Sequence, residues 1–302
     1  MVITVLIFIA LRIPWINEGE ALELWGSTFI QTGIALLLVN FAHKQSIIQQ
    51  RTLLPGFFYL LFVGTNPLFF YALRASISAF LILLCLWLLF DTYQNPLSQR
   101  KVLNISLVLA LGSFYWTPLL WFFPFVWYGM YLVKSLSVKT FFASLLGLPV
   151  VFLFLLAWYV YKNEGAVFLQ MLPNWSDLWD FRFFSSLNIN KLIANIFLGA
   201  LFILSVLNIF MASVAEKAQP RTFLTYLSLL TVVISILFFS QNQWKNEWSL
   251  ISYLPLSILL AHYFTLSQRK TILWLFLATI VFFLLMYIWQ WIPWRWFSWL
   301  GI

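Results

Sequence analysis

The chain has 302 residues, of which 63% are hydrophobic and only 9% are charged. A water-soluble domain carries about 25% charged residues. Together with a mean hydropathy of +0.93, this excludes a soluble globular enzyme, a disordered chain and a disulfide scaffold. We therefore predict an all-α polytopic membrane protein, a transmembrane helix bundle that forms a single domain over residues 1–302. The net charge of +8 implies no nucleic acid partner, because Lys and Arg retained on the cytoplasmic side give the same excess.

Apolar windows along the chain give the predicted spans. A bilayer core of about 30 Å needs about 20 apolar residues in a helix, and about eleven windows meet or approach that length. They are residues 1–15, 25–42, 54–72, 74–90, 102–117, 120–133, 140–161, 192–214, 222–239, 249–266 and 271–289. The windows 102–117 and 120–133 are either one broken helix or a tight helical pair.

The charges between these windows predict the topology. With the N-terminus inside, the cytoplasmic loops hold ten basic and two acidic residues, and the outer segments hold seven of each sign. The inner basic residues are Lys44, Arg51, Arg100, Lys101, Lys134, Lys139, Lys217, Arg221, Arg269 and Lys270. This asymmetry is the positive-inside pattern. It predicts an N-in, C-out, multi-pass protein of the bacterial cytoplasmic (inner) membrane.

Tryptophan is distributed as unevenly as charge. Fourteen of the 17 Trp residues lie at or beyond predicted outer span ends. Indole rings anchor helices at membrane interfaces, and they also stack on sugar rings or pack against lipid chains. The sequence leaves both interpretations open for this outer aromatic surface.

The first outer loop, Arg12 to Trp25, contains three carboxylates within six positions, Glu18, Glu20 and Glu23. On a helix, Glu20 and Glu23 would share one face. Such carboxylates can bind a divalent cation, the one cofactor we consider, or act as general base toward an acceptor hydroxyl. The alternative is an acidic loop that only keeps this end outside. No His, Cys and carboxylate cluster has the spacing of a metal site, so no metal ligands are assigned.

Arg74 is the second candidate, in a turn between two spans at the predicted outer side. An Arg in such apolar surroundings pairs with an anion or extends its guanidinium to the surface. Because guanidinium binds phosphate through two hydrogen bonds, a phosphate-bearing lipid head is a natural partner. Pairing with a protein carboxylate is the alternative.

The longest predicted soluble segment is the outer loop 162–191. Trp175, Leu178, Trp179 and Arg182 recur at helical spacing, which indicates a short helix lying in the membrane plane with an aromatic face. We predict that this loop contributes to substrate binding. Its candidate contacts are Trp175, Asp177, Asp180 and Arg182.

Several of these stretches resemble the GT-C superfamily of membrane glycosyltransferases. The similarity lies in Asn17-Glu18-Gly19-Glu20-Ala21-Leu22-Glu23, in Asn66-Pro67-Leu68-Phe69-Phe70-Tyr71 followed by Arg74, and in Leu107-Val108-Leu109-Ala110-Leu111-Gly112 followed by Pro118-Leu119-Leu120. It covers residues 10–135, so we interpret residues 1–135 as a GT-C-like part. The whole chain also resembles an uncharacterised bacterial family of polytopic membrane proteins.

The resemblance implies a glycosyltransferase that uses a polyprenyl-phosphate sugar at the outer face of the membrane. It would make Glu18 and Glu20 catalytic, with Glu23 beside them, and would place Arg74 against the carrier phosphate. Two positions depart from the pattern: Asn17 replaces the Asp of an Asp-Glu pair, and Tyr115-Trp116-Thr117 lacks a Lys. The alternatives are therefore a non-catalytic membrane subunit or scaffold of an envelope complex and, third, a transporter or flippase.

Overall fold

The computed structural model describes residues 2–12, 21–48, 50–163, 189–212, 218–266 and 270–291. This part of the chain is entirely helical, with eleven α-helices joined by turns and three short 3₁₀ segments. The α-helices are α1 (Val2–Ala10), α2 (Ala21–Lys44), α3 (Leu54–Gly64), α4 (Leu73–Phe90), α5 (Gln99–Tyr115), α6 (Phe122–Leu132), α7 (Val138–Tyr161), α9 (Ile189–Ala212), α10 (Ala218–Ser240), α11 (Lys245–Leu266) and α12 (Lys270–Trp291). The 3₁₀ segments are η3 (Pro67–Phe69), η4 (Thr117–Trp121) and η6 (Asn242–Trp244).

Each α-helix falls on one of the eleven apolar windows. Seven helices in the described ranges, α2, α4, α7, α9, α10, α11 and α12, are long and apolar enough to cross a membrane. The chain is therefore a multi-pass membrane protein. The remaining helices α1, α3, α5 and α6 have 17 residues or fewer. The number of crossings and their orientation stay predictions.

Windows 102–117 and 120–133 are two helices. α5 ends at Tyr115, and η4 turns the chain into α6. The amide of Gln94, just before α5, donates to the carbonyl of Val133, just after α6, at 2.8 Å. Because the start of α5 and the end of α6 meet, the two helices form a tight antiparallel pair.

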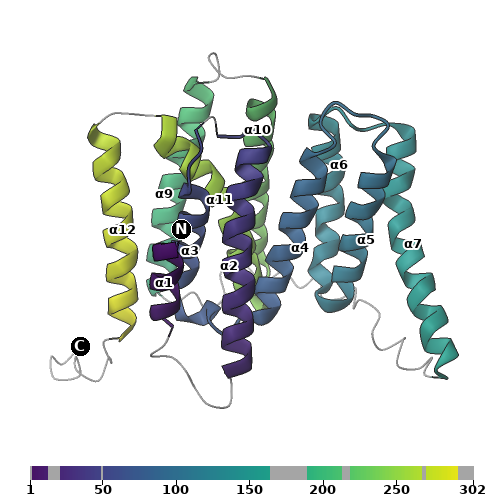
Figure 1. The fold of residues 1–302 in the computed structure, drawn as a ribbon, viewed down its shortest axis with the longest axis horizontal. Coiled ribbons are helices and arrows are strands. Elements are labelled where there is room, and N and C mark those ends of the chain that lie inside the picture. The colour runs from purple at the N-terminus through teal and green to yellow at the C-terminus, as the bar shows by residue number, and fades with distance from the viewer. Residues whose placement is uncertain are drawn as a thin grey trace.

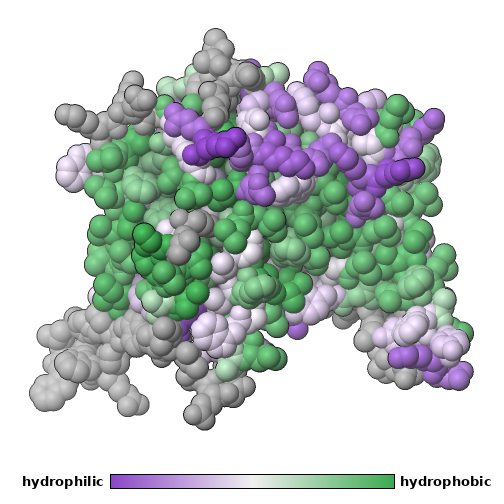
Figure 2. Space-filling view, viewed as in Figure 1, coloured by the Kyte–Doolittle hydropathy of each residue, from purple (hydrophilic) through white to green (hydrophobic). Residues whose placement is uncertain are grey.

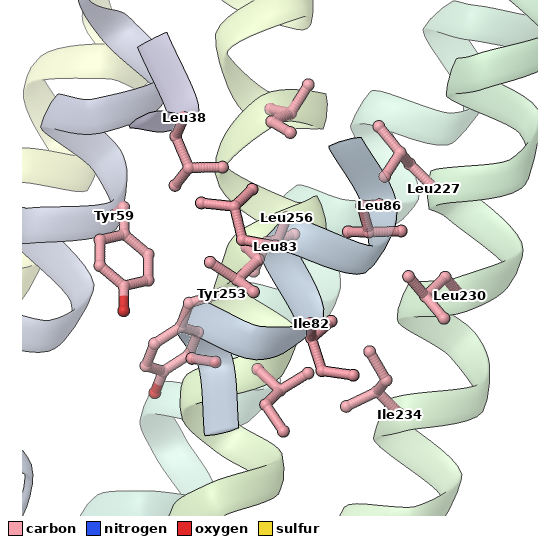
Figure 3. Packing of buried hydrophobic residues seen from close by; sticks show 14 of the residues in the cluster. Leu38, Tyr59, Ile82, Leu83, Leu86, Leu227, Leu230, Ile234, Tyr253 and Leu256 are labelled. Atoms are coloured by element: carbon pink, nitrogen blue, oxygen red, sulfur yellow. The ribbon is translucent and has the colours of Figure 1, made fainter. Parts of the chain in front are cut away.

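The bundle is organised around α11, the most enclosed of the seven candidate spans. It contacts α3, α4, α9 and α10, while α7 and α12 lie at opposite edges (Figure 1). In the core, Leu83 lies beside Leu256 of α11, and Leu86 faces Leu227 of α10 (Figure 3). These helices associate through van der Waals packing of their apolar side chains, because in lipid there is no hydrophobic driving force between helices.

The bundle has two chemically different ends. Lys44, at the end of α2, and Lys101, in the first turn of α5, lie 3.4 and 3.8 Å from the Asp91 carboxylate that follows α4. We call this the basic end; it is the hydrophilic upper edge in Figure 2, above an apolar belt. The opposite end holds indoles at the termini of several helices, and we call it the tryptophan end. Its members include Trp25, Trp116, Trp121, Trp158, Trp244, Trp248 and Trp289.

A break between α3 and α4 shapes the tryptophan end. Asn66 caps η3 by accepting the Leu68 amide at 3.2 Å, and Pro67 follows it. The carbonyls released there are satisfied by α2. Gln31 donates to the Phe69 carbonyl at 3.1 Å, and Ser27 donates to the Phe70 carbonyl. Such side-chain bonds are what permits a helix break at membrane depth.

Arg12 closes this network from the end of α1. Its guanidinium donates to Ser27, Thr28 and Gln31, and it lies 4.3 Å from the Phe8 ring centroid and 4.5 Å from that of Phe70. The topology argument counts Arg12 among the charges of the outer segments. In the structure it is instead a buried residue, 1% exposed, that joins α1 and α2 to the turn before α4.

Candidate functional site

Four polar side chains from four helices share the tryptophan end. Glu23 lies in the first turn of α2, Arg74 in the first turn of α4, Tyr115 ends α5, and Glu247 lies in the first turn of α11. Tyr115 interacts electrostatically with Arg74, Glu23 and Glu247, and Glu247 also interacts with Arg74. We refer to these four residues as the outer cluster.

Helix packing places Glu23 and Arg74 at the same end. α2 and α4 are neighbours, and a Cβ built on Gly26 would lie 3.3 Å from Leu73 Cδ1. A Cβ at this distance would require the Leu73 side chain to move by a few tenths of an ångström. Both charged side chains are exposed. Glu23 and Arg74 therefore lie at the same end of the bundle, and their joint role in a site stays a prediction.

Arg74 has no ion pair with any carboxylate in the described ranges, where the ion pairs are those of Asp91. Its guanidinium carbon instead lies 5.6 Å from the centroid of the Trp244 ring. A guanidinium over an indole gains cation–π attraction while its N–H groups stay free to bind an anion. Glu247, which is half-buried and within electrostatic reach of Arg74, is a carboxylate of the kind that serves as a general base.

Indole rings pack against one another at the same end of the bundle as the outer cluster. The Trp116 ring centroid lies 4.9 Å from that of Trp248 and 6.3 Å from that of Trp244. Trp248 Nε1 donates to Gln241 Oε1 at 3.0 Å. The buried indole N–H groups of Trp116 and Trp244 have no acceptor among the described residues. Such orphaned donors are uncommon, and both N–H groups are enclosed by protein.

The structure addresses two of the eight predicted site residues. Glu23 and Arg74 lie in the first turns of neighbouring helices at one end of the bundle. Glu18, Glu20, Trp175, Asp177, Asp180 and Arg182 lie outside the described residues. Within the described ranges, no group of three or more His, Cys, Asp or Glu residues is placed to hold a metal ion. Because Glu18 and Glu20 lie outside the described residues, the divalent cation considered at the first loop stays a prediction.

Sequence reasoning missed Glu247 and Tyr115 as members of the site. In the sequence, Glu247 is one of the seven acidic residues of the outer segments, and Tyr115 belongs to the stretch Tyr115-Trp116-Thr117 that lacks a Lys. A signal for Glu247 was present, because a carboxylate between Trp244 and Trp248 at the start of an apolar span is unusual. No sequence pattern predicts that Tyr115 ends beside it, because that depends on how α5 and α11 meet.

Comparisons with known proteins define the family. Neither the curated proteins nor the solved structures include one that matches the chain. The profile of a family of unknown function, DUF6427, matches residues 1–291, nearly the whole sequence. The protein, a multi-pass helical bundle with a charged and indole-rich cluster at one end, belongs to the DUF6427 family.

Proposed function

We propose that the protein transfers a sugar from a polyprenyl-phosphate carrier to a hydroxyl acceptor at the outer face of the bacterial cytoplasmic membrane. One observation carries the proposal: Glu23, Arg74, Tyr115 and Glu247 come from four separate helices to one end of the bundle. The resemblance of residues 10–135 to GT-C glycosyltransferases gives this geometry a matching chemistry. Under the proposal, the tryptophan end faces outward.

Arg74 would bind the carrier phosphate, since a guanidinium matches phosphate oxygens with two parallel hydrogen bonds. The guanidinium carbon lies 5.6 Å from the centroid of the Trp244 ring, which stabilises it by cation–π attraction. An indole surface also suits the apolar face of a sugar ring.

The carboxylates would supply the base. The acceptor hydroxyl gives its proton to a carboxylate while its oxygen bonds to the anomeric carbon. The bond from that carbon to the phosphate oxygen breaks, and polyprenyl phosphate leaves with the electron pair. Arg74 stabilises the negative charge that develops on it. Glu247 is the candidate base in the described part, and the sequence proposes Glu18 and Glu20 for the same role.

A transfer assay in proteoliposomes with radiolabelled polyprenyl-phosphate sugars tests this proposal. We expect Arg74→Gln to lower the transfer rate. The variant that removes the base, either Glu247→Gln or the double variant Glu18→Gln, Glu20→Gln, should lower the transfer rate by about 100-fold or more. Arg100→Gln, an exposed Arg at the basic end, is the matched control and should transfer normally.

The outcomes separate the proposed roles. A normal transfer rate in Arg74→Gln would contradict the binding of the carrier phosphate by Arg74. Normal transfer rates in all the carboxylate variants would contradict the proposed location of the active site. Carrier binding without transfer by the unmodified protein would favour the non-catalytic subunit.

A further inference from the structure

A cavity of 430 Å³ lies between α9, α10 and α11. This volume is within the size range of about 300–1,000 Å³ typical of ligand pockets. Among the described residues, Leu198, Phe202, Phe238 and Leu256 give it apolar walls. The described lining includes none of the residues of the outer cluster, which makes the cavity a second candidate site.

The cavity has an exposed apolar rim. Ile203 of α9 and Ile236 of α10 both line it and are exposed, at 58% and 57%. Both helices are long and apolar enough to cross a membrane, so apolar side chains exposed on them face lipid chains. A ligand therefore reaches the cavity from the bilayer, and most of its surface must be apolar.

Side-chain hydroxyls line the same cavity. Thr231 and Ser235 lie one turn apart on α10, and Ser249 and Ser252 share one face of α11. Hydroxyl oxygens in apolar surroundings are costly to bury without hydrogen bonds. What these groups can still bond decides which ligand suits the cavity.

Each of the four hydroxyls already donates its proton to a backbone carbonyl of its own helix. Thr231 and Ser235 donate to the carbonyls four positions earlier on α10, both at 2.8 Å. Ser249 and Ser252 donate to carbonyls four and three positions earlier on α11, both at 2.7 Å. Because a hydroxyl has one proton and two acceptor lone pairs, these side chains can offer a ligand only acceptors. A matching ligand must bring a donor.

Asn195 of α9 adds a carboxamide, which has both donor N–H groups and an acceptor oxygen, to the lining. An alcohol satisfies both kinds of group, because its O–H donates to a hydroxyl oxygen while its own oxygen accepts from an amide. An ester, ether or ketone has no proton to donate. An ammonium group could donate, but its burial costs far more than that of a neutral hydroxyl.

We propose that the cavity between α9, α10 and α11 binds a lipid alcohol. Its hydrocarbon chain lies against the apolar walls, and its hydroxyl bonds among Asn195, Ser235 and Ser252. The proposal is independent of sugar transfer, because it uses no residue of the outer cluster.

Two pairs of serines make a matched test. The cavity pair, Ser235→Ala with Ser252→Ala, removes one lining hydroxyl from α10 and one from α11. The control pair, Ser228→Ala with Ser257→Ala, removes hydroxyls from the same two helices. Those hydroxyls also donate to carbonyls of their own helix, both at 2.8 Å, but are not part of the described lining. The two pairs therefore lose the same kind of intrahelical bond and differ in their place relative to the cavity.

Native mass spectrometry of the purified protein, delipidated and incubated with oleyl alcohol or its methyl ether, gives the readout. The two probes share one chain, and the ether lacks the donor. We expect the unmodified protein and the control pair to retain the alcohol about fivefold better than the ether. The cavity pair should lose this preference and still retain the ether.

A steric variant and a crosslinker locate the binding. Gly199 lines the cavity, and a Cβ built on it meets nothing within 4 Å, so Gly199→Leu should fill the cavity and lower retention of both probes. A photoactivatable long-chain alcohol should crosslink to peptides of α9, α10 and α11 in the unmodified protein.

Equal retention of alcohol and ether by the unmodified protein would overturn the proposal. So would a cavity pair that prefers the alcohol as strongly as the control pair does, or crosslinks confined to other helices. Because sugar transfer is not measured, none of these results depends on the proposed glycosyltransferase activity.

Discussion

At the scale of single residues, Arg12 is the most constrained charge in the described part of the chain. It is buried, and within the described residues its guanidinium donates hydrogen bonds to neutral side chains of α2 rather than to a carboxylate. An uncompensated charge in an apolar interior is costly. Here two Phe rings and several oxygen acceptors replace the water that the guanidinium loses.

Arg12→Lys is expected to destabilise the protein by about 1–3 kcal/mol. A single ammonium group cannot reproduce the planar set of donors that spans Ser27, Thr28 and Gln31, and it stacks poorly between two rings. Thermal unfolding in detergent measures the effect. Arg100→Lys, at an exposed position, should change the melting temperature little, and an equal shift in both variants would contradict this role for Arg12.

Helix packing is tightest between α5 and α7. A Cβ built on Gly147 of α7 would lie 2.8 Å from the backbone carbonyl carbon of Ser106 on α5. Only Gly allows backbones to approach this closely, as small residues do generally at membrane helix interfaces. Nearby, Trp127 of α6 donates to Ser144 of α7 at 2.9 Å, which connects the α5–α6 pair to the same helix.

Gly147→Ala should therefore cost about 1–3 kcal/mol through overpacking, although Ala favours helix over Gly. At Gly33, where an added Cβ meets nothing within 4 Å, the same substitution should stabilise the protein by about 0.5–1 kcal/mol. Melting temperatures of the two variants in the same detergent are expected to move in opposite directions. A Gly147→Ala protein as stable as Gly33→Ala would disprove the close contact.

At the scale of helices, the length of the apolar runs is enough to predict all the helices of the described part. In lipid, a helix satisfies the hydrogen bonds of its backbone N–H and C=O groups within the same segment. Windows such as 54–72 were longer than the helices they contain. α3 ends at Gly64 because Asn66 and Pro67 begin a new segment. The carbonyls of that break are satisfied by Gln31 and Ser27, partners that no local pattern indicates.

The site was harder to predict than the helices. Arg74 and Glu23 could be selected from the sequence because charged residues are rare in so apolar a chain. Their association with Glu247, 173 positions beyond Arg74, depends on α11 occupying the centre of the bundle.

At the scale of the whole molecule, the two ends differ in charge and in aromatic content. The basic end gathers Lys44, Asp91 and Lys101, and the tryptophan end holds the outer cluster. The positive-inside rule predicts that the basic end faces the cytoplasm. This assignment predicts that the outer cluster lies on the outer surface.

Cysteine labelling of intact cells tests that orientation. Leu97→Cys at the basic end and Lys162→Cys after α7 are both exposed positions, and the native Cys85 is buried. A membrane-impermeant maleimide should label Lys162→Cys in intact cells and Leu97→Cys only after permeabilisation. The reverse pattern would place the outer cluster in the cytoplasm and contradict the proposed function.

The most direct measurement of the central claim is equilibrium binding of polyprenyl phosphate to the purified protein, because the outer cluster is proposed to recognise a lipid-linked phosphate through Arg74. Replacing a charge-assisted contact of this kind costs about 1.5–3 kcal/mol, so Arg74→Gln should weaken binding by about tenfold or more. Arg74→Lys should be intermediate, and Arg100→Gln at the basic end should bind like the unmodified protein. Equal affinity of Arg74→Gln and Arg100→Gln would contradict the account.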